Sequence, residues 1–131
     1  MPKRILIVDD DSSLCNSFTM LLRGEGYSVD STMDSLEGEI LVRQDKYDIC
    51  FFDYKMKGLN GKELLKITKN VNPLCSVFIV TAMMNIDDLC KKEIKAGLVA
   101  GIIGKPFYVE ELLQRIAAID QDLSKRASIP R

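Results

Sequence analysis

The fold is decided by Asp48-Ile-Cys-Phe-Phe-Asp53-Tyr-Lys-Met-Lys-Gly58-Leu-Asn-Gly61. The apolar run Ile49 to Phe52 is too short for a membrane-spanning helix and is typical of a strand buried on both faces. It ends at a carboxylate, after which the glycines and the asparagine indicate a turn. Open α/β folds place their ligands at the carboxyl ends of parallel strands. Asp53 is therefore a candidate site residue, although it could also merely cap the helix that follows the turn.

Composition limits the classes of protein that fit. A chain of 131 residues, 47% of them hydrophobic, is long enough for one domain with a substantial core. The net charge of −1 gives no reason to expect nucleic acid or a membrane surface as a partner of this domain. The four cysteines show neither a C-x-x-C pair nor zinc spacing, and no signal peptide is evident, so a cytoplasmic location is expected. The absence of histidine excludes a histidine base, a histidine metal ligand and phosphohistidine on this chain.

Apolar spacing along the chain predicts five strands that alternate with five helices. The strands are expected at 4–8, 27–32, 49–52, 76–80 and 102–103. The helices are expected from Leu14 to Gly24, from Leu36 to about Gln44, from about Lys62 to Asn70, from Ile86 to Gly97, and from Val109 to Leu123. This alternation predicts an α/β fold with a single doubly wound parallel sheet. The domain is expected to cover residues 1–124, with 125–131 as a basic tail or the start of a linker.

Polar residues follow four of the predicted strands, where right-handed crossovers bring the strand ends to one edge of the sheet. They are Asp9 and Asp10, Asp53, Thr81 and Lys105. Three converging carboxylates repel one another, and a hard cation such as Mg²⁺ relieves that repulsion. The hydroxyl and the ammonium suit a phosphoryl oxygen, so the set describes a phosphoryl-transfer site.

Each of these residues also has a simpler structural explanation. Asp9, Asp10 and Asp11 could cap a helix, Thr81 could be an ordinary strand residue, and Lys105 could be a solvated strand end. The order of the set, with each member at a strand end, favours the functional interpretation.

The sequence resembles the receiver (CheY-like) domain of two-component response regulators over about residues 3 to 124. The resemblance is carried by four stretches: Ile-Leu-Ile-Val-Asp9-Asp10-Asp11; Tyr-Asp-Ile-Cys-Phe-Phe-Asp53 with Met56, Gly58 and Gly61; Val-Thr81-Ala82; and Lys105-Pro106-Phe107. It implies a flavodoxin-like (βα)5 fold with the strand order 2-1-3-4-5.

The resemblance also implies roles for the site residues. Asp53 would accept a phosphoryl group from the phosphohistidine of a sensor histidine kinase or a phosphotransfer protein. Asp9, Asp10, Asp53 and the backbone carbonyl of Lys55 would hold Mg²⁺. The protein would then be a signalling domain that regulates a downstream protein target, with self-phosphorylation and dephosphorylation chemistry but no separate enzyme activity.

Two further residues would act on the phosphoryl group. Lys105 would pair with it, aided by a cis peptide bond to Pro106 that directs the lysine side chain. Thr81 would move toward the phosphoryl group and report its presence.

The chain departs from the family pattern at four positions. Lys57 stands where the family usually has proline, so the turn is expected to be less rigid. Lys55 adds a cation at a position thought to tune phosphoryl loss. Ile102 replaces the switch aromatic, and Tyr108 replaces the small polar residue that normally caps the last helix.

Two alternatives remain open from the sequence. Haloacid-dehalogenase-like phosphatases use Mg²⁺ with a strand-end Asp-x-Asp, a threonine and a lysine, which Asp9-x-Asp11, Thr81 and Lys105 imitate. They need a further acidic pair at a later strand end, whereas only helical acids follow Lys105. A pseudo-receiver that docks partners without phosphorylation is the other alternative.

Overall fold

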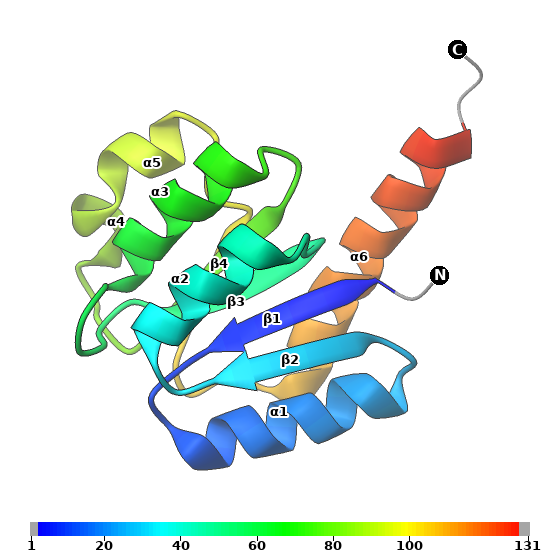
Figure 1. The fold of residues 1–131 in the computed structure, drawn as a ribbon, viewed down its shortest axis with the longest axis horizontal. Helices are drawn as coiled ribbons and strands as arrows, with labels where there is room; N and C mark the ends of the chain where they lie inside the picture. The colour runs from blue at the N-terminus through cyan, green and yellow to red at the C-terminus, as the bar shows by residue number, and fades with distance from the viewer. Residues whose placement is uncertain (1–2, 129–131) are drawn as a thin grey trace.

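A computed structural model describes the backbone of residues 3–128 and the side chains of residues 3–119. Its strands are β1 (Arg4–Val8), β2 (Ser28–Thr32), β3 (Ile49–Asp53), β4 (Ser76–Thr81) and β5 (Gly101–Gly104). Its helices are α1 (Ser12–Gly24), α2 (Ser35–Gln44), α3 (Gly61–Val71), α4 (Ile86–Leu89), α5 (Lys91–Lys95) and α6 (Val109–Ser128). The strands form one parallel sheet in the order β2-β1-β3-β4-β5, which confirms the predicted fold (Figure 1).

The register of the sheet aligns the strand ends that carry the predicted site. Val8 pairs with Phe52, Asp53 with Val80, and Thr81 with Gly104. All five residues of β3 are buried, as the uninterrupted apolar run predicts. β2 lies at the edge of the sheet and buries only Val29 and Thr32, as its more polar sequence suggests.

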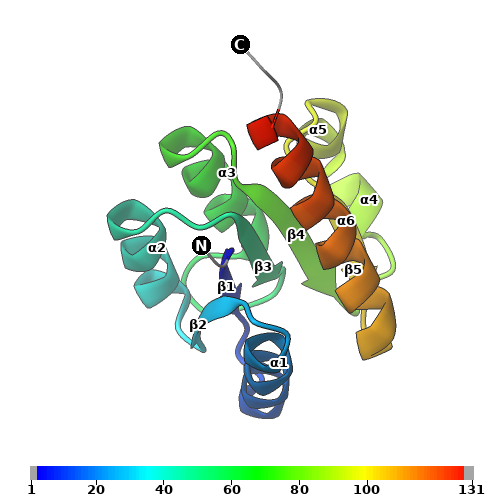
Figure 2. The same cartoon turned by 90° about the vertical axis from the view of Figure 1, so that its right-hand side faces the viewer.

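Two hydrophobic clusters cover the two faces of the sheet. One joins alternate strand residues to α1 and α6, through side chains such as Phe18, Leu112 and Ile116. The other joins the remaining strand residues to α2, α3 and α4, through side chains such as Val42, Leu64 and Ile86. Figure 2 shows α1 on the side of the sheet away from α2 and α3. The four cysteines are buried free thiols, in keeping with their positions in apolar or helical stretches of the sequence.

The second helix forms where predicted, but a different face of it is buried. Leu36 and Ile40, which suggest the helix in the sequence, are each 54% exposed. Ser35, Gly38 and Val42 face the core instead. An added Cβ at Gly38 would lie 3.0 Å from Val8 Cγ2, so the small residue permits close packing of α2 on β1.

The prediction of one helix from Ile86 to Gly97 is wrong, because the segment divides into α4 and α5. Cys90 lies at the break with φ −111° and ψ 20°. In a continuous helix the Leu89 carbonyl would pair with the amide four residues later. It instead accepts a hydrogen bond from Lys62 Nζ at 3.0 Å. Within residues 3–128 the sheet is therefore accompanied by six helices rather than five.

The final helix extends to Ser128, past the predicted domain end at residue 124. The side chain of Leu123 lies outside the described residues, as do residues 129–131 of the predicted tail. The domain boundary stays a prediction. Among the described residues, no helix is both long and apolar enough to span a membrane.

Candidate functional site

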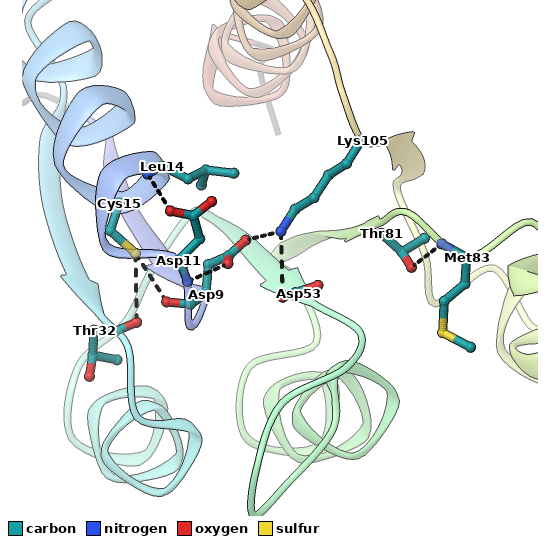
Figure 3. A network of polar contacts seen from close by, with 9 residues as sticks. All are labelled: Asp9, Asp11, Leu14, Cys15, Thr32, Asp53, Thr81, Met83 and Lys105. Carbon is teal, nitrogen blue, oxygen red and sulfur yellow. Dashed lines mark hydrogen bonds and ion pairs between the residues drawn. The ribbon is translucent and has the colours of Figure 1, made fainter.

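Four of the polar residues predicted at the strand ends, Asp9, Asp53, Thr81 and Lys105, lie around one point at the edge of the sheet (Figure 3). Asp9 follows β1, Asp53 ends β3, Thr81 ends β4 and Lys105 follows β5. Asp9, Asp53 and Thr81 are placed by buried strands, and Lys105 by the edge strand β5, whose register is fixed by its pairing with β4. The sheet thus assembles in space a set that is scattered along the sequence.

Three carboxylates form the acidic part of the site. Asp9, Asp10 and Asp53 each offer one oxygen, and these oxygens lie within 4.8 Å of one another. Asp9 and Asp53 are buried, with 2% and 8% exposure, whereas Asp10 is exposed. An all-oxygen site with two buried acids suits a hard divalent cation such as Mg²⁺. The residues present therefore fit the metal that the sequence suggests.

Lys105 supplies the positive charge of the site. Its Nζ lies 2.8 Å from Asp9 Oδ2 and 3.5 Å from Asp53 Oδ2. Burial lowers the pKa of Lys105, but its hydrogen bond to Asp9 and the charges of Asp9 and Asp53 outweigh this and raise the pKa overall. The ammonium is thus held charged, in reach of any anionic group carried by Asp53.

The surroundings of Asp53 oppose its ionisation. Burial, followed by the charge of Asp9, raises its pKa from 3.8 to about 6; Lys105 opposes this shift, and Asp10 adds to it. At neutral pH the carboxylate is still mostly ionised, which a nucleophile requires. A bound cation would reduce the free-energy cost of ionising Asp53.

Thr81 lies at the end of β4, close to the acids but bonded elsewhere. Its side chain is buried, and its Oγ1 accepts a hydrogen bond from the Met83 amide at 2.9 Å (Figure 3). This bond orders the start of the β4–α4 loop. The movement of the Thr81 side chain toward a phosphoryl group stays a prediction.

The peptide bond between Lys105 and Pro106 is cis, which confirms the geometry that the family resemblance implies. Asp11, in contrast, does not join the acidic cluster. Its Oδ1 accepts a hydrogen bond from the Leu14 amide at 3.1 Å and caps α1. The Asp-x-Asp pair that the phosphatase alternative requires is therefore divided between the site and a helix cap.

The β3–α3 loop, residues 54–60, carries the metal-binding carbonyl predicted at Lys55, whose side chain is exposed. The loop closes where the Gly61 amide donates to the Tyr54 carbonyl at 2.9 Å. An added Cβ at Gly61 would lie 2.7 Å from the Asp53 carbonyl oxygen, so only glycine permits this approach. The next helix begins with a capping box between Asn60 and Glu63. The role of the Lys55 carbonyl stays a prediction.

Sequence reasoning missed one residue that touches this loop. Ser35, in the first turn of α2, is hydrogen-bonded to the backbone of both Lys57 and Leu59. The only sequence signal is a serine at a helix start, which by itself predicts a local cap and not a contact 22 residues away.

Comparison with known proteins agrees with this geometry. Residues 5–117 match the family described as the response regulator receiver domain. Response regulator MprA of Mycolicibacterium vanbaalenii is 34% identical over 122 residues, which cover 91% of this chain and 51% of MprA. The alginate biosynthesis transcriptional regulatory protein AlgB of Pseudomonas aeruginosa is 34% identical over 90% of this chain and 25% of its own length.

A solved structure shows the same fold over almost the whole chain. The response regulator receiver domain protein (CheY-like) from Methanospirillum hungatei JF-1 superposes with a TM-score of 0.85 and 28% identity. The match covers 95% of this chain and 99% of that one. In contrast, the chain spans about half the length, or less, of the curated relatives that it matches.

Proposed function

Since this chain belongs to the response regulator receiver domain family, we propose that it accepts a phosphoryl group on Asp53 in a reaction that depends on Mg²⁺. The observation that carries the proposal is the meeting of three carboxylate oxygens within 4.8 Å with the Lys105 ammonium beside two of those acids. Phosphoryl transfer depends mainly on positioning and on charge stabilisation, which this arrangement can provide.

In the proposed reaction, a carboxylate oxygen of Asp53 forms a bond to phosphorus, and the bond from phosphorus to the donor nitrogen breaks. The imidazole of the donor leaves with the electron pair and takes up a proton. Asp9, Asp10, Asp53 and the Lys55 carbonyl would hold the metal, which supplies charge neutralisation for the phosphoryl oxygens. Lys105 would exchange its contact with Asp53 for one with the new phosphoryl group, and Thr81 would offer its hydroxyl to the same group.

The partners in this proposal follow from the chemistry. By its family, the donor would be the phosphohistidine of a sensor histidine kinase or phosphotransfer protein. That histidine would lie outside these 131 residues, which contain none. The product would regulate binding to a downstream protein in the cytoplasm. No direct role with nucleic acid or membranes is proposed for this domain.

The direct test is mass spectrometry after incubation with acetyl phosphate and Mg²⁺. One phosphoryl group should be added per chain, as an acyl phosphate that hydroxylamine releases. Asp53→Ala should abolish the modification, whereas Asp11→Ala should retain it because Asp11 caps α1. Finding the label on Asp9, or phosphate turnover that survives Asp53→Ala, would instead support the phosphatase alternative.

A further inference from the structure

The side chain of Ser35 connects α2 to the middle of the β3–α3 loop. It is 1% exposed, and its hydroxyl donates to the Lys57 carbonyl at 2.6 Å. The same oxygen accepts a hydrogen bond from the Leu59 amide at 2.9 Å. One hydroxyl thus serves as donor and acceptor and fixes the two backbone groups on either side of Gly58.

The rest of the loop is held at its ends. The Tyr54 amide donates to the Val80 carbonyl at 3.1 Å, and Gly61 closes the other end on Tyr54. Between them, Met56 and Leu59 pack partly against the core. Within the described residues, the two bonds from Ser35 are the only hydrogen bonds that reach the loop from Lys55 to Leu59.

Gly58 shows that the turn is built around this hydroxyl. Its φ is +80°, a conformation that favours glycine. An added Cβ at this position would lie 2.8 Å from Ser35 Oγ. Both the backbone conformation and the space for the hydroxyl therefore depend on glycine.

The location of the contact connects it to the site. Lys57, Met33 and Asp34 line a hollow of about 380 Å³ together with Asp10, one of the three site acids. The start of α2 and the loop therefore form one wall next to the acidic cluster. Lys57 occupies the position where the family usually has proline, so the backbone of this turn lacks the restriction that a proline ring imposes.

We propose that Ser35 is a positioning residue for the acceptor site, and that its hydroxyl supplies the rigidity that a proline at position 57 would otherwise provide. The inference rests on the proposed function, because the loop that Ser35 fixes carries the Lys55 carbonyl predicted to bind the metal. Ser35 contacts neither the metal nor the phosphoryl group; it acts through the loop backbone.

The test compares Ser35→Ala with the wild-type chain in three measurements. The Leu59 amide should exchange with deuterium faster in the variant, because it loses its acceptor. The Kd for Mg²⁺, taken from a thermal-shift titration, should rise about tenfold, in the range seen when supports of metal ligands are removed. The rate of phosphoryl acceptance from acetyl phosphate should fall by a similar factor at subsaturating Mg²⁺.

Two further variants separate positioning from general loss of stability. Thr68→Val also removes a buried hydroxyl, but that hydroxyl bonds within α3 to the Leu64 carbonyl. It should leave the Mg²⁺ affinity unchanged. In Ser35→Ala/Lys57→Pro, the proline should restore most of the Mg²⁺ affinity, because within the described residues the Lys57 amide donates no hydrogen bond that proline would remove.

The outcomes distinguish this inference from the proposed function. If the wild-type chain accepts phosphoryl on Asp53 and Ser35→Ala has the same Mg²⁺ affinity and rate, the role of Ser35 is refuted and the proposed function stands. A double variant that stays as impaired as Ser35→Ala also refutes the role in turn rigidity. A wild-type chain that accepts no phosphoryl group refutes the proposed function, whatever the loop exchange shows.

Discussion

Replacing Asp53 by asparagine should make the metal-free protein more stable at neutral pH. Burial, then the charge of Asp9, raises the pKa of Asp53 to about 6 against the opposing effect of Lys105. A raised folded-state pKa means that the folded chain binds a proton more tightly than the unfolded chain. That contribution to stability is complete below about pH 4 and is lost as the pH rises through about 6.

The size of the effect follows from that difference in pKa. Folding raises the pKa of Asp53 from 3.8 to about 6, and each pKa unit corresponds to about 1.36 kcal/mol. As the pH rises, wild type therefore loses roughly 3 kcal/mol of unfolding free energy that Asp53→Asn retains. The difference in unfolding free energy should therefore grow from about 1 kcal/mol at pH 4.5 to about 3 kcal/mol at pH 7.5. Mg²⁺ should reduce this difference in unfolding free energy. It should stabilise wild type by mass action, and it should bind the variant more weakly because the variant has one carboxylate ligand fewer.

Urea unfolding at a series of pH values, with a chelator and then with Mg²⁺, measures this difference. Asp11→Asn is the matched control, since it removes the same charge from an exposed residue and asparagine caps helices as well as aspartate does. Its unfolding free energy should stay within about 0.5 kcal/mol of wild type. A difference for Asp53→Asn that is the same at every pH, or that the control reproduces, would refute the argument from burial and repulsion.

Three other changes test separate parts of the site. Gly61→Ala should destabilise the fold by about 1–3 kcal/mol, because the new methyl would overlap the backbone of Asp53; unchanged urea unfolding would contradict this. Lys105→Ala should still accept a phosphoryl group by mass spectrometry, but the modification should no longer change amide exchange in the β3–α3 loop; a wild-type exchange response in this variant would remove the role given to the ammonium. In the wild-type chain, phosphorylation should change exchange more at residues 54–60 than at 86–104, because no switch aromatic is present in β5, and the opposite pattern would overturn this prediction.

The strands and the site acids were predictable because both depend on local sequence. A buried strand such as Ile49–Asp53 requires a continuous apolar run, and a polar residue at its end is visible without knowledge of the partners. The parallel topology then brings the strand ends together. Asp9 and Asp53 could therefore be placed at one edge of the sheet before their distances were known.

Contacts made by single side chains between elements were not predictable in the same way. Ser35 reaches a loop 22 residues away, and Lys62 reaches a carbonyl 27 residues away. Neither contact leaves a periodic signal, since each depends on how a helix lies against a backbone segment that is distant in the sequence. The second of them lies at the break between α4 and α5, which the apolar spacing from Ile86 to Ile94 does not reveal.

The contact between Lys62 and Leu89 restricts how the molecule can deform. The helix that carries Lys62 begins at Gly61, whose backbone abuts the Asp53 carbonyl too closely to allow a Cβ. Lys62 is the next residue, and its ammonium donates a hydrogen bond to the Leu89 carbonyl at the end of α4. A shift of α4 away from α3 therefore has to lengthen or break this hydrogen bond, unless the lysine side chain changes its conformation. The hydrogen bond therefore links the end of α4, through the start of α3, to the end of the central strand.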